Sequence, residues 1–164
     1  PEDGVVNDIF TIDFPQNITQ VHFIKLRLFD TKGKEVANTF YWRSNDKYEG
    51  RKTLTGPTSS GFEDLSKLKQ VQLKTRYQTY QEGDRHFIKA EIKNPSSTVA
   101  FFTQLQLLGQ DKKPVRPSFY TDNFFSLLPG ESKTVIIETA ASDMPSEPTF
   151  VVKGWNIKPS SFKL

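Results

Sequence analysis

The sequence predicts an all-β protein whose larger part is an antiparallel β-sandwich. Three observations predict this fold class. First, short stretches alternate apolar and polar residues; in 101–108 the odd-numbered residues would face one side of a strand and the even-numbered ones the other. Second, turn-forming residues separate these stretches at short intervals. Third, no stretch carries a helical period longer than two turns.

The larger part of the chain supplies most of the strand candidates. They lie at 71–77, 86–93, 101–108, 115–120, 133–139 and 149–157. Turn signals stand between them, among them Glu82-Gly83-Asp84, Asn94-Pro95 and Pro129-Gly130. Pro114 and Pro117 each remove a backbone donor, so we expect the strand at 115–120 to lie at an edge or to carry a bulge.

A shorter β-rich part precedes it. Alternation predicts a short strand at 10–14 and a hairpin over 21–42, followed by a polar loop over 43–61 with a strand candidate at 52–54 and a short helical turn at 62–68. An immunoglobulin-type sandwich needs about seven strands and about 100 residues, which this part does not offer. Either it packs on the larger part as a sub-layer, or its other strands precede residue 1. We prefer the second explanation, and a start at Pro1 without methionine suggests an excised piece.

The hairpin has a counterpart further along the chain. A shift of 79 positions (102 − 23) places Phe23 on Phe102 without a gap. The same shift superposes Leu26 on Leu105, Leu28 on Leu107, Lys34 on Lys113, Val36 on Val115, and Phe40-Tyr41 on Phe119-Tyr120. Two amphipathic hairpins resemble one another because both obey a period of two, and a duplicated domain would look the same. Both explanations stay open.

Composition excludes several classes of site. The chain has 164 residues and a net charge of +3, and its basic residues alternate along strands instead of clustering as in nucleic-acid binders. Without cysteine it can form neither a disulfide framework nor a thiolate metal site. No apolar run approaches the roughly 20 residues that span a membrane. The sequence therefore predicts no nucleic-acid partner and no membrane span.

Catalytic and cofactor chemistry has little support. His22 and His86, the two histidines, stand near no serine in a recognised motif and offer no transition-metal spacing, so we interpret both as structural. The acidic pairs Glu63-Asp64, Glu82/Asp84 and Asp143/Glu147 fall in turns or surface segments. Glycosidase carboxylates instead flank a cleft. There is no glycine-rich phosphate loop. We therefore predict no catalytic, cofactor-binding or metal-binding residue.

Aromatic side chains leave room for a sugar contact. The rings that an exposed platform could use are Tyr41, Trp42, Tyr48, Tyr120, Phe124 and Trp155. For Phe124 and Trp155 we favour core or interdomain packing. Tyr41 and Trp42 are the candidates for contact with a sugar or a neighbouring domain, because adjacent strand residues face opposite ways and one of them can be exposed.

The segment 120–131 (YTDNFFSLLPGE) is the densest motif of the chain. We expect Asp122 and Asn123 to satisfy backbone groups with their side chains, and Pro129-Gly130 to form a turn. The predicted structural residues are Tyr120, Asp122, Asn123, Pro129, Gly130 and Trp155.

Three segments together resemble a known family. They are 23–42 (FIKLRLFDTKGKEVANTFYW), 94–108 (NPSSTVAFFTQLQLL), and 120–131 with the later Gly154-Trp155-Asn156. They resemble the C-terminal immunoglobulin-like sandwich region of glycoside hydrolase family 2 enzymes, in the branch of exo-β-D-glucosaminidases and β-mannosidases. The resemblance implies a partial immunoglobulin-like sandwich over 1–55 (the end of the penultimate domain), a linker over 56–64, and a complete C-terminal one over 65–164.

The resemblance also implies a function. The family's catalytic glutamates sit on a (β/α)8 barrel, and no position here corresponds to them. We therefore expect accessory domains that buttress the barrel of a glycosidase, with that barrel as the partner and with no cofactor. The alternative is an independent carbohydrate-binding or adhesive module, with a carbohydrate as partner. The compartment stays open, with a bacterial periplasmic or secreted location expected over a cytoplasmic one.

Overall fold

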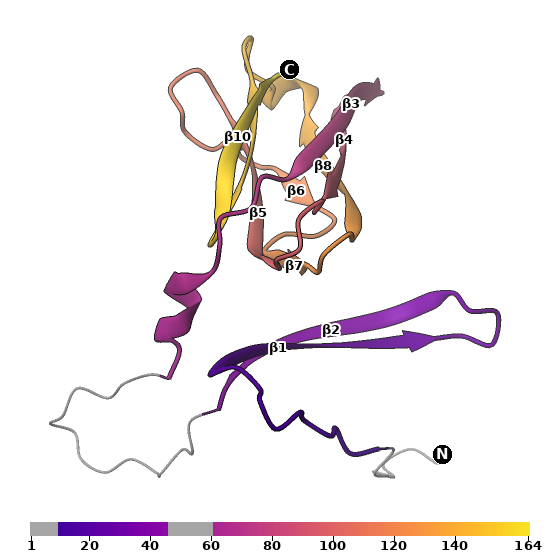
Figure 1. The fold of residues 1–164 in the computed structure, drawn as a ribbon. Helices are drawn as coiled ribbons and strands as arrows, with labels where there is room; N and C mark the ends of the chain where they lie inside the picture. The colour runs from indigo at the N-terminus through magenta and orange to yellow at the C-terminus, as the bar shows by residue number, and fades with distance from the viewer. Residues whose placement is uncertain (1–9, 46–60) are drawn as a thin grey trace, which may run out of the picture. The chain divides into compact units, whose positions relative to one another are not determined.

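The chain forms two compact units in a computed structural model, which describes residues 10–45 and 61–164 (Figure 1). The first unit is Pro1–Leu65 and the second is Ser66–Leu164. The described residues form strands and short 3-10 helices, and no helix among them is long and apolar enough to cross a membrane. The strand candidate at 52–54, and most of the predicted linker at 56–64, lie outside the described residues.

The first unit contains the predicted hairpin. Strands β1 (Val21–Phe29) and β2 (Glu35–Ser44) pair antiparallel, with Ile24 opposite Tyr41. Asp30 closes the turn, because its Oδ1 accepts from the amides of Lys32 and Lys34, each at 2.9 Å. The strand predicted at 10–14 was wrong: these residues are irregular, and Phe10 is 67% exposed. Alternation gives only a propensity, and a strand also needs a partner for its backbone groups.

The second unit is a sandwich of two four-stranded antiparallel sheets. One sheet has the order β10-β9-β5-β7, and the other β3-β4-β8-β6. Their bounds are β3 Lys74–Glu82, β4 Arg85–Lys93, β5 Ala100–Leu108, β6 Phe119–Tyr120, β7 Phe125–Leu127, β8 Ser132–Ala140, β9 Thr149–Gly154 and β10 Ile157–Lys163. The 3-10 helix η1 (Glu63–Lys67), predicted as a helical turn, precedes the sandwich, and η2 (Ala141–Asp143) follows β8. In Figure 1, β10 and β5 lie on one side and β3, β4 and β8 on the other.

Strand β5 confirms the predicted alternation. Phe101, Thr103, Leu105 and Leu107 are buried, whereas Phe102 is 38% exposed. Leu105 and Leu107 belong to one core together with residues of β4, β8 and β9, namely Ile88, Ile92, Val135, Ile137, Phe150 and Val152. Each Å² of apolar surface removed from water stabilises the folded state by about 25 cal/mol. This core is therefore the main stabilising element of the unit.

Three strand boundaries differ from the prediction. The strand expected at 115–120 shrinks to the two residues of β6, because proline lacks the amide that a ladder needs and Pro117 lies two positions before this strand. The candidate at 149–157 turns at Trp155-Asn156 and continues as the unpredicted β10. Val71 makes only an isolated bridge to Ile157, and β3 begins at Lys74.

The 79-position likeness holds at the turn and ends just beyond it. The amide of Asp30 donates to Lys34 O at 2.9 Å, and that of Gly109 donates to Lys113 O at the same distance. Gly33 and Lys112, also 79 apart, have positive φ angles of 77° and 59°. Thereafter β2 stays paired with β1, whereas the chain after Lys113 bridges β5 at Pro114 and then joins β8. Shared ancestry and shared turn geometry remain alternative explanations.

Candidate functional site

Tyr120, Asp122 and Asn123 lie where the chain crosses from one sheet of the sandwich to the other. Tyr120 ends β6, which pairs with β8, and Phe125 begins β7, which pairs with β5. Between them, Asn123 Oδ1 accepts from the amide of Leu105 at 2.8 Å, and its Nδ2 donates to the carbonyl of Leu105 at 3.1 Å. The side chain of Asn123 thus replaces a neighbouring strand at this point of β5.

Tyr120 makes a second contact with the edge of β5. Its hydroxyl accepts a hydrogen bond from the amide of Leu107 at 3.0 Å. Burial raises the pKa of the Tyr120 phenol, and the bond from Leu107 opposes part of that effect. The site therefore holds a neutral hydroxyl, suited to bridging two sheets.

Asp122 is held more loosely than its neighbour. Its Oδ1 accepts from the amide of Asn123 at 2.7 Å, and its Oδ2 forms an ion pair with Lys133 Nζ from β8. The side chains of Asp122 and Lys133 are 39% and 31% exposed, so water screens this pair. The ammonium of Lys133 also lies 5.2 Å from the centre of the Phe125 ring.

Pro129-Gly130 forms the predicted turn between β7 and β8. Gly130 has a φ of 80°, which glycine adopts without steric cost. Its amide donates to Asn94 O at 2.9 Å, while Leu128 N donates to Glu131 Oε2 at 2.9 Å. The turn is thereby joined to the connection that follows β4.

Two buried asparagines were not predicted as site residues. Asn94 is fully buried, and its Nδ2 donates to Thr98 O at 2.8 Å and to Leu127 O at 3.0 Å. Asn156 Nδ2 donates to Lys69 O at 2.9 Å and to Val99 O at 2.8 Å, and its Oδ1 accepts from Phe101 N at 2.9 Å. Asparagine is also a common exposed turn residue, so nothing local in the sequence marked these two as buried.

Tyr41 and Trp42 do not form a common platform on the hairpin. Tyr41 is 48% exposed and lies opposite Ile24, whereas Trp42 is 42% exposed and lies opposite Phe23, so they occupy opposite faces of the hairpin. Trp155 is 60% exposed, which excludes a place in the core. Phe124 is 50% exposed, with the same consequence. Tyr48 lies outside the described residues.

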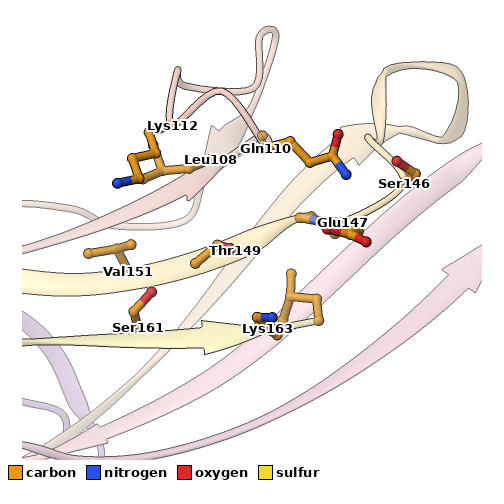
Figure 2. Close-up of a pocket in the computed structure, with 12 residues that line it drawn as sticks. Leu108, Gln110, Lys112, Ser146, Glu147, Thr149, Val151, Ser161 and Lys163 are labelled. Atoms are coloured by element: carbon orange, nitrogen blue, oxygen red, sulfur yellow. The ribbon is translucent and has the colours of Figure 1, made fainter.

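A cavity of about 550 Å³ opens elsewhere on the sandwich, over the ends of β5, β9 and β10 (Figure 2). Leu108 and Val151 give it an apolar wall, while Lys112, Lys163 and Glu147 bring charged groups. Glu147 is the one acidic side chain among the residues that line it. The cavity therefore lacks the carboxylate pair that glycoside hydrolysis uses.

Both histidines lie in the part of the chain that the structure describes. His22 contacts Phe14 edge-on, with ring centres 5.3 Å apart, in the first unit. His86 lies on β4 opposite Thr139. Within residues 10–45 and 61–164, no group of three or more His, Asp or Glu side chains could hold a metal ion.

Comparison with known sequences identifies the family of this domain. The family model described as "Exo-beta-D-glucosaminidase Ig-fold domain" matches residues 53–157. The chain belongs to this family. The immunoglobulin-like sandwich that the sequence predicted is thus an Ig-fold domain of the glucosaminidase type.

Two curated relatives carry the same assignment. An exo-beta-D-glucosaminidase from Streptomyces avermitilis is 30% identical over 149 residues, which cover 85% of this chain and 16% of the relative. One from Amycolatopsis orientalis is 27% identical over 157 residues, covering 89% of this chain and 15% of the relative. The chain thus spans about a sixth of the length of these relatives. The fold of this chain is also similar to the crystal structure of Amycolatopsis orientalis exo-chitosanase CsxA, with a TM-score of 0.79 and 24% sequence identity. The match covers 94% of this chain and 19% of that one.

Proposed function

We propose that this chain is a non-catalytic accessory region of a family 2 exo-β-glycosidase of the glucosaminidase type, where it buttresses the catalytic barrel. The observation that carries the proposal is the match of residues 53–157 to the Ig-fold domain of exo-β-D-glucosaminidases. The two curated relatives are about six times as long as this chain, so we expect it to be part of a larger polypeptide.

Size and chemistry support the non-catalytic role. A (β/α)8 barrel takes about 250 residues, and the chain has 164. The polar groups of the predicted motif residues Tyr120 and Asn123 form hydrogen bonds with the backbone of β5. Such contacts hold a fold together and leave no group poised for proton transfer.

The alternative is an independent carbohydrate-binding module, which draws its support from the exposed Tyr41 and Trp42. Because they lie on opposite faces of the hairpin, each face offers only one of the two rings. A β-mannosidase parent is the other variant of the proposal. We also propose a periplasmic or secreted location, which cell fractionation would test.

Hydrolysis of p-nitrophenyl β-D-glucosaminide by three proteins tests the proposal. They are the full-length polypeptide, the same polypeptide without this chain, and this chain alone. We expect turnover from the first, less activity and a lower melting temperature for the second, and no turnover from the third. Turnover by the chain alone, lost on substitution of one of its acidic residues, would refute the non-catalytic role. A truncated enzyme as stable and active as the full one would refute the buttressing role.

A further inference from the structure

Three exposed aromatic side chains gather at one end of the β10-β9-β5-β7 sheet, and we call them the aromatic patch: Phe102, Phe124 and Trp155. They are 38%, 50% and 60% exposed. The ring centres of Phe102 and Phe124 are 5.7 Å apart. The amide of Trp155 donates to Phe101 O at 3.0 Å, which places the tryptophan beside the start of β5.

The backbone under the patch is strained. Phe102 and Phe124 both have a φ of 57°, a conformation that bulky residues rarely adopt. Phe102 sits where the pairing of β5 with β7 shifts register between Ala100 and Thr103. Strained backbone of this kind tends to persist at functional positions. It presents two rings on the surface of the sandwich.

The rim of the patch is polar and basic. On the outward face of the same sheet, Gln104 lies opposite Lys153. Lys153 makes no ion pair with any residue that the structure describes. An apolar centre of aromatic residues with a polar rim is the usual anatomy of a protein–protein interface. A complementary partner would bring an apolar surface with a carboxylate at its edge.

We propose that the aromatic patch docks against the catalytic barrel of the same polypeptide, with a barrel carboxylate facing Lys153. This inference rests on the proposed function. The curated relatives extend far beyond the region that this chain matches, so a partner domain would belong to the same polypeptide. Two surfaces joined by one polypeptide meet at an effective concentration of about millimolar. A small patch can therefore suffice. A flat sugar ring stacks best on coplanar rings, whereas Phe102 and Phe124 are tilted by 54°.

Hydroxyl-radical footprinting, which labels exposed rings, tests the docking surface. The full-length polypeptide is compared with the 164-residue chain. Trp155 and Phe124 should lose most of their labelling in the full-length polypeptide. Phe119 is the matched control, because it is 57% exposed and belongs to the other sheet, and it should be labelled in both. Equal labelling of Trp155 and Phe124 in the two proteins would overturn the proposal.

Variants of the full-length polypeptide provide the second arm. Removing a central interface aromatic weakens docking by about tenfold or more. Trp155→Ser should therefore restore the labelling of Phe124, whereas Phe119→Ser should not. Phe124 that stays protected in Trp155→Ser would contradict a role for the patch. Far-ultraviolet circular dichroism of the variant chains checks that each one still folds.

The outcomes also separate this inference from the proposed function. If removal of the whole chain destabilises the enzyme but Trp155 and Phe124 are labelled equally in both proteins, the domain buttresses the barrel through another surface and only the patch is refuted. If removal of the chain has no effect, the proposed function itself fails. If chito-oligosaccharide protects Trp155 in the 164-residue chain, the patch is a sugar site and the docking proposal is overturned.

Discussion

Three asparagine side chains link separate parts of the sandwich through hydrogen bonds to the backbone. Asn94, Asn123 and Asn156 each bond backbone groups of segments distant in sequence. Asn156 alone joins Lys69, Val99 and Phe101. A buried donor or acceptor that loses its partner costs about 1–3 kcal/mol. Such residues therefore contribute more to stability than their small side chains suggest.

Asp122 and Asn123 should differ sharply in their contribution to stability. Asn123→Ala leaves both backbone groups of Leu105 without their partner, so we expect a loss of about 1–3 kcal/mol in the free energy of unfolding. Asp122→Ala removes a screened ion pair worth about 0–1 kcal/mol. Urea unfolding of both variants measures the difference. Equal losses, or a stable Asn123→Ala variant that instead loses glycan affinity, would contradict the structural account.

Tyr120 should make stability depend on pH at the alkaline end. Because burial raises the pKa of Tyr120 in the folded state, its contribution is fully present below the unfolded pKa of about 10 and is lost as pH rises further. Tyr120→Phe lacks this titration but leaves the amide of Leu107 unpaired, at about 1–3 kcal/mol near neutral pH. The difference in unfolding free energy between wild type and variant should shrink from pH 9 to 11. A constant difference would show that Tyr120 does not titrate on unfolding.

At the scale of elements, tight turns decide how the strands of the sandwich are placed. The turn after β9 brings Gly154 so close to β5 that an added Cβ would lie 2.9 Å from Phe102 O and 3.1 Å from Phe101 O. Both are backbone atoms and cannot swing away. The turn after β3 is open by contrast, because nothing lies within 4 Å of a Cβ on Gly83.

Gly154→Ala should therefore destabilise the sandwich by about 1–3 kcal/mol through overpacking. It should also change the surroundings of Trp155, visible as a shift of its indole NMR signal. Gly83→Ala is the control, with a smaller cost of about 1 kcal/mol from its positive φ alone. A Gly154→Ala variant as stable as wild type would mean that the turn can move away from β5.

At the scale of the whole molecule, we expect the two units to differ in their ability to fold alone. The sandwich has a core shared by both of its sheets. Within residues 10–45 the first unit offers a two-stranded sheet on which several apolar side chains are exposed, among them Leu28 at 62% and Tyr41 at 48%. An isolated hairpin is marginally stable at best in water. This contrast fits the proposal that 1–55 is the end of a preceding domain.

A fragment of residues 66–164 should fold by itself, and a fragment of residues 1–45 should not. For the first we expect cooperative thermal unfolding and dispersed amide NMR signals, and for the second a spectrum of a disordered peptide. The measurement requires only the two fragments and the intact chain. A folded 1–45 fragment would contradict the expectation that its apolar face needs further strands.

The sequence by itself determined the fold class, the sandwich and most of its strands. Alternation placed β4, β5 and β8 within two residues at either end, because these strands bury one face and expose the other. It also marked the crossing segment of Tyr120, Asp122 and Asn123, although not which of them carries the hydrogen bonds.

Only the tertiary structure decided the rest. Strand β10 follows a turn at Trp155-Asn156 that the apolar pattern runs through without a break, and the candidate at 10–14 forms no strand because strand formation depends on a partner. The burial of Asn94 and Asn156 and the exposure of Trp155 depend on which distant segments meet there. A local pattern records a residue's preference for water or core, whereas its actual surroundings come from contacts between residues far apart in the chain.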